Sequence, residues 1–188
     1  MTNKELKELN DLNLADNNAK KITAEKLREL TTEFVKSNGS FADYNNSSVT
    51  HQNITAGVWT KLTNNGSGTL TETSYKPYYC SSMFSGDEVR LANIPLGTVV
   101  TLRLDNTITV LSNNTNVTYR VKFKDSLGAT VYTSEFDFKH YKNATTVSSV
   151  SLYNFYIGDA ILDGSISLEV NAENNITALW NGCLITIP

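Results

Sequence analysis

The C-terminal stretch, residues 165–188, constrains the fold more than any other part of this sequence. Residues 165–170 (SISLEV) alternate polar and apolar side chains, which is typical of a strand with one dry face. An Asn-rich turn and two further apolar stretches come next, and a bend or bulge is predicted at Asn181 and Gly182. A chain that ends on a strand this apolar is expected to hold it inside a sheet, so the preceding residues must supply that sheet.

Short strand-like stretches succeed one another from about residue 49. Residues 117–124 (VTYRVKFK) show the cleanest alternation, and residues 125–128 (DSLG) predict a tight hairpin turn after them. Further strands are expected at residues 98–105 (TVVTLRLD) and 129–140, with no helical pattern between them. About eight strands at this spacing predict a mainly β protein, an antiparallel jelly-roll sandwich.

The residues before this β region have a different character. Residues 1–38 are predicted to form an anchor peptide and a short helical segment, residues 39–56 a linker (SFADYNNSS, 40–48) and a first strand, and residues 57–188 the β domain, which we expect to fold alone. The first peptide is too short and too rich in Asn to hold as an isolated helix. Its leucines are therefore expected to anchor the chain to a capsid or another partner: Leu6, Leu9, Leu12 and Leu14.

The helical segment runs from residue 24 to about residue 36. Thr23 is a good N-cap, and Gly39 stands just past the end as a stop signal. Its narrow apolar stripe must pack against another surface, which is either the β domain or copies of the same helix. In the second case the stripe forms part of a trimer interface: Leu27, Leu30, Phe34 and Val35.

Composition and motifs exclude several functions. A net charge of −3, with no stripe of Lys or Arg, gives no electrostatic case for nucleic-acid binding. No apolar run approaches the ~20 residues of a membrane span, and no signal peptide is visible at the N-terminus. Nucleotide-binding and nucleophile motifs are missing as well, so we expect a non-enzymatic protein without cofactors.

A few residues are candidates for specific chemistry. Cys80 and Cys183 are expected to be reduced and mostly buried, with a disulfide between them as the alternative. The only histidines, His51 and His140, lie too far apart in sequence to suggest a metal site.

Two pairs of carboxylates have either a structural role or a functional one. Asp159 and Asp163 are ordinary turn residues or, alternatively, calcium ligands. Glu135 and Asp137 share one strand face, where they either increase solubility or form a pair for glycoside hydrolysis.

The aromatic residues fall into two groups. The first follows strand patterns and is predicted to be core: Trp59, Tyr119, Phe123, Phe136, Phe138, Phe155 and Trp180. The second is less constrained and forms either a seam between subunits or a platform for stacking on sugars: Tyr75, Tyr78, Tyr79, Tyr132, Tyr141, Tyr153 and Tyr156. Tyr75, Tyr78 and Tyr79, around Pro77, are the candidates for glycan binding.

Four stretches of the chain resemble a known group of proteins. ITAEKLRELTTEFVKSNG, followed by NITAGVWTKLTNNGSGT, resembles the opening of small structural proteins of tailed bacteriophages. EVRLANIPLGTVVTLRLD and YIGDAILDGSISLEVNAENNITALWNGCLITI resemble the tumour-necrosis-factor-like jelly rolls of phage appendages. The resemblance covers most of the chain from Ile22 onward, and the richness in Asn is consistent with an AT-rich genome such as that of a crAss-like phage.

This resemblance implies a virion protein. Domains of this kind are typically trimeric and mount on capsids or tails as head fibres, decorations or receptor-binding tips. It implies a homotrimer located in the virion, attached to a capsid or other virion protein through the N-terminus, with host surface glycan as a further partner. The alternative is a carbohydrate-binding module of a tail or surface appendage.

Overall fold

The computed structural model describes residue 26 and residues 40–45, 51–64, 69–70, 76–77, 79–80, 82–141 and 145–187. The chain divides into two compact units, Phe41–Ile187 and Met1–Ser40 together with Pro188, and the first of them holds the β domain. The anchor leucines (Leu6, Leu9, Leu12, Leu14) and the helix residues Leu27, Leu30, Phe34 and Val35 lie outside the described residues, and so do Tyr75 and Tyr78.

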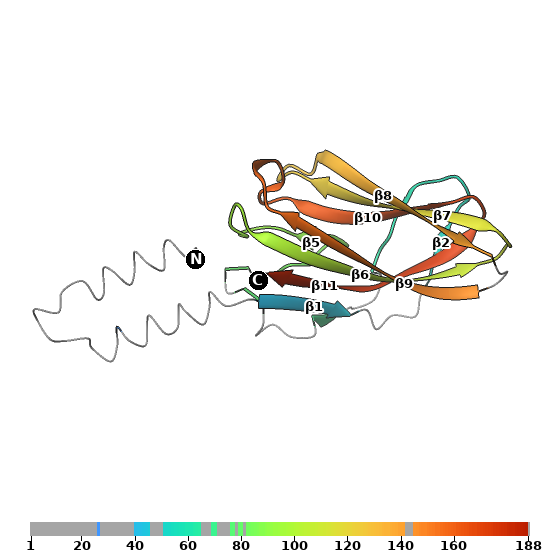
Figure 1. The fold of residues 1–188 in the computed structure, drawn as a ribbon, viewed down its shortest axis with the longest axis horizontal. Helices are drawn as coiled ribbons and strands as arrows, with labels where there is room; N and C mark the ends of the chain where they lie inside the picture. Colours follow the sequence, from blue (N-terminus) through green and yellow to red (C-terminus); the bar gives the residue numbers. More distant parts are fainter. Residues whose placement is uncertain are drawn as a thin grey trace, which may run out of the picture. The chain divides into compact units, whose positions relative to one another are not determined.

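The described residues form two antiparallel sheets (Figure 1). We call them sheet A and sheet B. Sheet A has the order β4-β1-β11-β6-β9, with β2 also paired to β11. Its strands are β1 (Ser40–Asn45), β2 (Gln52–Ile54), β4 (Thr69–Leu70), β6 (Val99–Val110), β9 (Thr145–Tyr156) and β11 (Ile176–Ile187).

Sheet B has the order β3-β10-β7-β8, with β5 also paired to β10. Its strands are β3 (Thr60–Lys61), β5 (Val89–Arg90), β7 (Thr115–Lys124), β8 (Thr130–His140) and β10 (Ser165–Ala172). A single 3-10 turn, η2 (Asp159–Ile161), connects β9 to β10 within the described part of the chain. The long strands cross repeatedly between the sheets, from β6 in A to β7 and β8 in B, then to β9, β10 and β11 in turn. The predicted antiparallel jelly-roll sandwich is confirmed.

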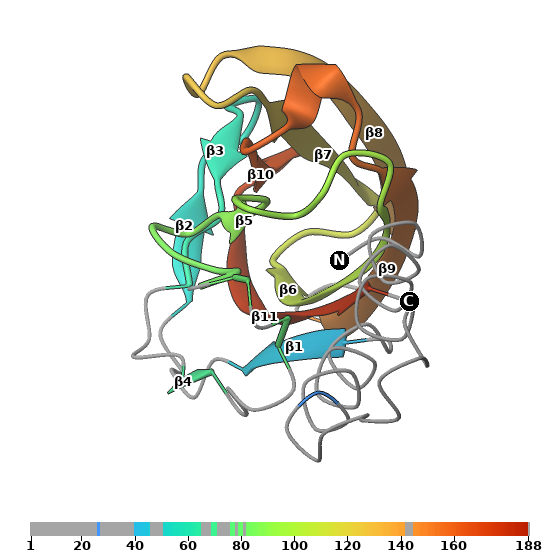
Figure 2. The same cartoon turned by 90° about the vertical axis from the view of Figure 1, so that its left-hand side faces the viewer.

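Alternation of side chains produces the core between the two sheets, whose strands Figure 2 shows end-on. In β7 every second residue is buried, including Val117, Tyr119, Val121 and Phe123 as predicted. Facing residues of β6, β10 and β11 complete one apolar cluster. Because each inward side chain is removed from water, burial of these rows is the main stabilising term of the sandwich.

The last strand lies inside sheet A, between β1 and β6, which confirms its predicted internal position. Its register shifts between Trp180 and Gly182, where the predicted bulge occurs. The bulge explains why the side chains that join the core cluster are even-numbered up to Trp180 and odd-numbered from Cys183 onward. The Trp180 indole, fully buried, donates a hydrogen bond of 2.9 Å to the carbonyl oxygen of Gly182 and so fixes the bulge.

The segment at 40–48 is a correction to the sequence prediction. We expected a linker there, but residues 40–45 form β1, and the fully buried Ala42 and the largely buried Tyr44 belong to the core. The Tyr44 hydroxyl accepts a hydrogen bond of 2.8 Å from the Met83 backbone N–H, which fastens this strand to the loop before β5. A domain that starts at residue 57 would lack β1 and β2, and its independent folding stays a prediction.

Glu88 ties three strands of sheet B together through its buried carboxylate. It accepts hydrogen bonds from Lys124 Nζ of β7 at 2.5 Å, Lys61 Nζ of β3 at 2.9 Å and Ser165 Oγ of β10 at 2.7 Å. Burial opposes ionisation of Glu88, but the hydrogen bonds from Lys124, Ser165 and Lys61 outweigh it and lower the pKa to about 2. The ionised carboxylate therefore stabilises the folded state.

We expect this pKa to make the fold sensitive to acid. Because the pKa is lower in the folded state, the stabilisation is present above the ordinary value of 4.5 and is lost as the pH falls towards 2. Glu88→Gln should lower the free energy of unfolding at neutral pH by about 3 kcal/mol, with the difference vanishing near pH 2. Urea titrations at several pH values measure this. Glu135→Gln, at an exposed ion pair, is the control and should have a much smaller effect; an equal effect would contradict the role of Glu88.

Candidate binding surfaces

The outer face of sheet B is organised in rows across β10, β7 and β8. One row places Asn171 opposite Thr118 and Thr118 opposite Asp137. The neighbouring row consists of Glu169, Arg120 and Glu135. The rows arise from the period of two, because the residues between the buried positions of each strand point to this face.

The second row, together with Lys122, forms a chain of ion pairs. Arg120 lies 2.6 Å from Glu135 and 3.7 Å from Glu169, and Lys122 lies 2.7 Å from Glu169. The Arg120 guanidinium also lies 3.6 Å from the centre of the Trp59 ring. Trp59 was predicted to be core, and this was wrong: it is only partly buried, above the outer face of the sheet, where a cation attracts it.

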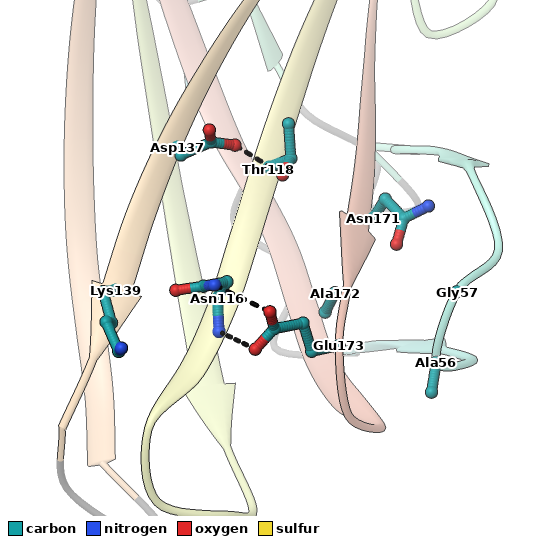
Figure 3. Close-up of a pocket in the computed structure, with 9 residues that line it drawn as sticks. All are labelled: Ala56, Gly57, Asn116, Thr118, Asp137, Lys139, Asn171, Ala172 and Glu173. Carbon is teal, nitrogen blue, oxygen red and sulfur yellow. Dashed lines mark hydrogen bonds between the residues drawn. The ribbon is translucent and has the colours of Figure 1, made fainter.

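A polar pocket of about 730 Å³ lies next to this network (Figure 3). It extends over the first row and over the residues beyond it towards the end of the sheet. Its lining comprises Ala56, Gly57, Asn116, Thr118, Asp137, Lys139, Asn171, Ala172 and Glu173.

Hydrogen bonds fix the polar groups of this pocket. The Thr118 hydroxyl donates to Asp137 at 2.5 Å. Glu173 receives the backbone N–H of Asn116 at 3.2 Å and its side-chain amide at 2.7 Å, so both of its carboxylate oxygens are used. Both contacts are visible in Figure 3, and they leave Asn116 and Asp137 in defined orientations.

The loop between β2 and β3 forms one wall of the pocket. The Gly57 backbone N–H donates to the Ala172 carbonyl at 2.8 Å, and the Ala56 N–H to the Asn175 side chain at 2.9 Å. Gly57 has a φ of 73°, a left-handed conformation that other residues adopt at a cost. The wall is thus held by two hydrogen bonds, one to the end of β10 and one to the turn that follows it.

A second surface lies where the two sheets end. β8 is the last strand of sheet B and β9 the last strand of sheet A in the described part of the chain, on the same side of the sandwich (Figure 2). Their inward rings meet: Phe136 contacts Tyr153 with 5.8 Å between ring centres, and behind them Phe123 contacts Phe155 at 5.2 Å. We call the inward rings of β8 and β9 the aromatic edge: Tyr132, Phe136, Phe138, Tyr153 and Phe155.

The aromatic edge is only partly covered. Tyr132 stacks on Phe123 at 4.1 Å but remains 43% exposed, and Phe138, predicted to be core, is 39% exposed. On the other face of β9, Leu152 and Tyr156 are both 68% exposed. A hollow of about 390 Å³ lies beside this edge and is lined by Tyr132, Asn154, Phe155, Tyr156, Gly158, Ala160 and Ile161. Apolar side chains therefore lie on both faces of the end of β9 whose side chains the structure describes, residues 152–156.

The cysteines, the turn aspartate Asp163 and the histidines show no arrangement specific to a binding or catalytic site among the described residues. Cys80 and Cys183 are free and buried as predicted, and burial raises the pKa of the Cys80 thiol to about 11. Asp163, with a φ of 55°, accepts the Asn93 backbone N–H at 2.9 Å, as a turn residue does. His51 is exposed, whereas burial lowers the pKa of His140.

The carboxylates proposed as a hydrolytic pair are both engaged, Glu135 by Arg120 and Asp137 by Thr118. Within the described residues, His, Cys, Asp and Glu form no group of three suited to a metal ion. The same part of the chain contains no helix of the length and apolarity that crossing a membrane requires.

The tyrosines predicted to form a seam between subunits or a platform for sugars differ in burial. Tyr79 packs partly against the core, and Tyr153 is half-buried with a pKa that burial raises to about 12. Tyr132, Tyr141 and Tyr156 are exposed. Sequence reasoning missed the polar pocket, since its residues lie on separate strands; the only signal was their outward position in alternating segments.

No protein-family model and no curated protein sequence matches this chain. Several solved structures match its fold. A chain of infectious bursal disease virus, Gx strain, is 10% identical with a TM-score of 0.51, over 80% of this chain and 32% of that one. T=1 particles derived from the same virus give the same values. Eiger TNF from S. frugiperda is 10% identical with a TM-score of 0.50, over 79% of this chain and 91% of the other. This chain spans about a third of the virus chains, and at these identities the likeness shows a shared jelly-roll fold.

Proposed function

We propose that this protein is a non-enzymatic structural protein of a virion, a trimeric head fibre or capsid decoration of a tailed bacteriophage that contacts the host surface. The observation that carries the proposal is the half-covered aromatic edge with its apolar surroundings on β9. A fold that occurs in virus particles and in a TNF, together with the phage-like sequence stretches, supports the same function.

Contact between copies would remove the exposed rings from water. Each further 100 Å² of apolar surface buried stabilises an interface by roughly 2.5 kcal/mol before the cost of association. The edge is asymmetric, with rings on the inner face of β9 and Leu152 and Tyr156 on the outer face. In this proposal the rings of one copy cover Leu152 and Tyr156 of the next, a head-to-tail contact that closes into a ring such as a trimer.

The N-terminal residues would complete the assembly. In this proposal Leu27, Leu30, Phe34 and Val35 form a small helical bundle about the symmetry axis. The peptides bearing Leu6, Leu9, Leu12 and Leu14 are then brought together. Three weak contacts with a capsid would act jointly, because the second and third form at a raised effective concentration.

We expect light scattering to give a mass of about three times the 20.8 kDa of one chain. Leu152→Asp should reduce that mass to one chain while the circular dichroism stays unchanged, because the side chain is already mostly exposed in the single subunit. Leu127→Asp, at a position 92% exposed in the turn between β7 and β8, is the matched control and should leave the trimer intact. A wild-type mass of one chain at high concentration would overturn the trimer.

Deletion of residues 1–21 tests the anchor. The truncated chain should keep its β domain, because the described core contains none of these residues, but should no longer join particles. Complementation of a phage that lacks the gene, followed by protein analysis of purified particles, measures this. Leu127→Asp serves here as a full-length control, and normal incorporation of the truncated chain would contradict the anchoring role.

A second candidate function is that of a carbohydrate-binding module, and the polar pocket on sheet B favours it. The two functions are compatible, since a fibre that contacts the host also needs a site for a surface polymer. Tyr75, Tyr78 and Tyr79 remain the alternative location for such a site.

A further inference from the structure

We propose that the polar pocket on the outer face of sheet B binds a neutral, hydroxyl-rich sugar unit of a glycan. This inference rests on the carbohydrate-binding function and is independent of the trimer. The pocket volume of about 730 Å³ falls in the range of small-ligand sites, about 300–1,000 Å³.

The pocket offers both kinds of hydrogen-bonding partner that a sugar hydroxyl needs. The Asn171 side-chain amide forms no hydrogen bond with the described residues, so its oxygen can accept and its nitrogen can donate. Asp137 uses one oxygen for Thr118 and keeps the other as an acceptor. Lys139, on β8 like Asp137, adds a donor on the side of the pocket away from Asn171, as Figure 3 shows.

The pocket carries charges of both signs, so neither an anion nor a cation meets a fully complementary site. Asp137 and Glu173 would repel an anionic ligand, and Lys139 would repel a cation. Glu173 already accepts two hydrogen bonds from Asn116, whereas Asp137 accepts one from Thr118, so Asp137 keeps the larger acceptor capacity for a ligand. A neutral polyol remains as the ligand class that satisfies the mixed donors and acceptors.

Trp59 is not a lining residue of the pocket but lies near it in the chain and on the sheet. It comes two residues after Gly57 in the loop that forms the wall, and its ring lies over Arg120, two residues from Thr118 on the same face of β7. A partly exposed indole beside polar groups suits a pyranose, which presents C–H groups on its faces and hydroxyls around its rim.

The site is largely formed before a ligand arrives. Thr118 orients Asp137, Glu173 orients Asn116, and the loop at Gly57 is held to β10. Because Asp137, Asn116 and the loop already have defined positions, binding would mainly have to order the side chains of Asn171 and Lys139.

Saturation-transfer NMR on the full-length protein tests the proposal with glucose, galactose and N-acetylglucosamine as probes. At least one probe should give a signal that saturates with concentration. Asn171→Ala and Asp137→Asn should each weaken binding about tenfold, as expected for the loss of hydrogen bonds inside a site. Thr133→Ala, exposed on the same face of β8 but outside the pocket, is the matched control and should bind as the wild type does.

Three results would overturn the proposal: no saturable signal from any probe, a signal that neither pocket variant weakens, or a signal lost in Tyr78→Ala but kept in Asn171→Ala. The last would place the sugar at the tyrosines. Circular dichroism and the mass of each variant, measured on the same samples, establish that the fold is intact. They also separate failure of the sugar site from failure of the trimer, since absence of binding leaves the mass unchanged.

Discussion

Burial of alternate side chains between two sheets is the interaction on which the rest of this structure depends. The rows of β7 and β10 face those of β6 and β11, and one side of each strand is thereby committed to the core. The other side is free to carry polar groups, which on sheet B form the ion pairs of Arg120 and the pocket around Asn171 and Asp137. The candidate sugar site is therefore a by-product of the same period of two that builds the core.

The same arrangement leaves one side of the sandwich incomplete. β8 and β9 end their sheets in the described part of the chain. Their inward rings contact each other, but no further described strand lies beyond either of the two edges. Rings such as Tyr132 and Phe138 stay partly in contact with water. We propose that other copies of the chain cover this edge, while the polar face of sheet B remains turned outward for a ligand. Assembly and recognition would thus use different surfaces of one domain.

Much of this fold could be predicted from the sequence because each long strand carries its own pattern. The alternation of β7, the internal position of β11 and the bulge after Trp180 are local signals. The strand β1 was mistaken for a linker because its short sequence runs into the polar residues 45–48 and gains its place only by pairing within sheet A. Trp59 was assigned to the core because its attraction to Arg120 joins residues far apart in the chain. The pocket could not be foreseen for the same reason, since the register between β10, β7 and β8 creates it.

Hydrogen exchange along β8 and β9 tests most directly whether other copies cover the aromatic edge. Edge strands of an isolated sandwich exchange their outer amides readily, whereas strands sealed by a neighbour exchange slowly. We predict that peptides from β9 exchange slowly at high protein concentration and faster on dilution, while peptides from the internal strand β11 stay protected throughout. Fast exchange of β9 that does not depend on concentration would contradict the proposed assembly.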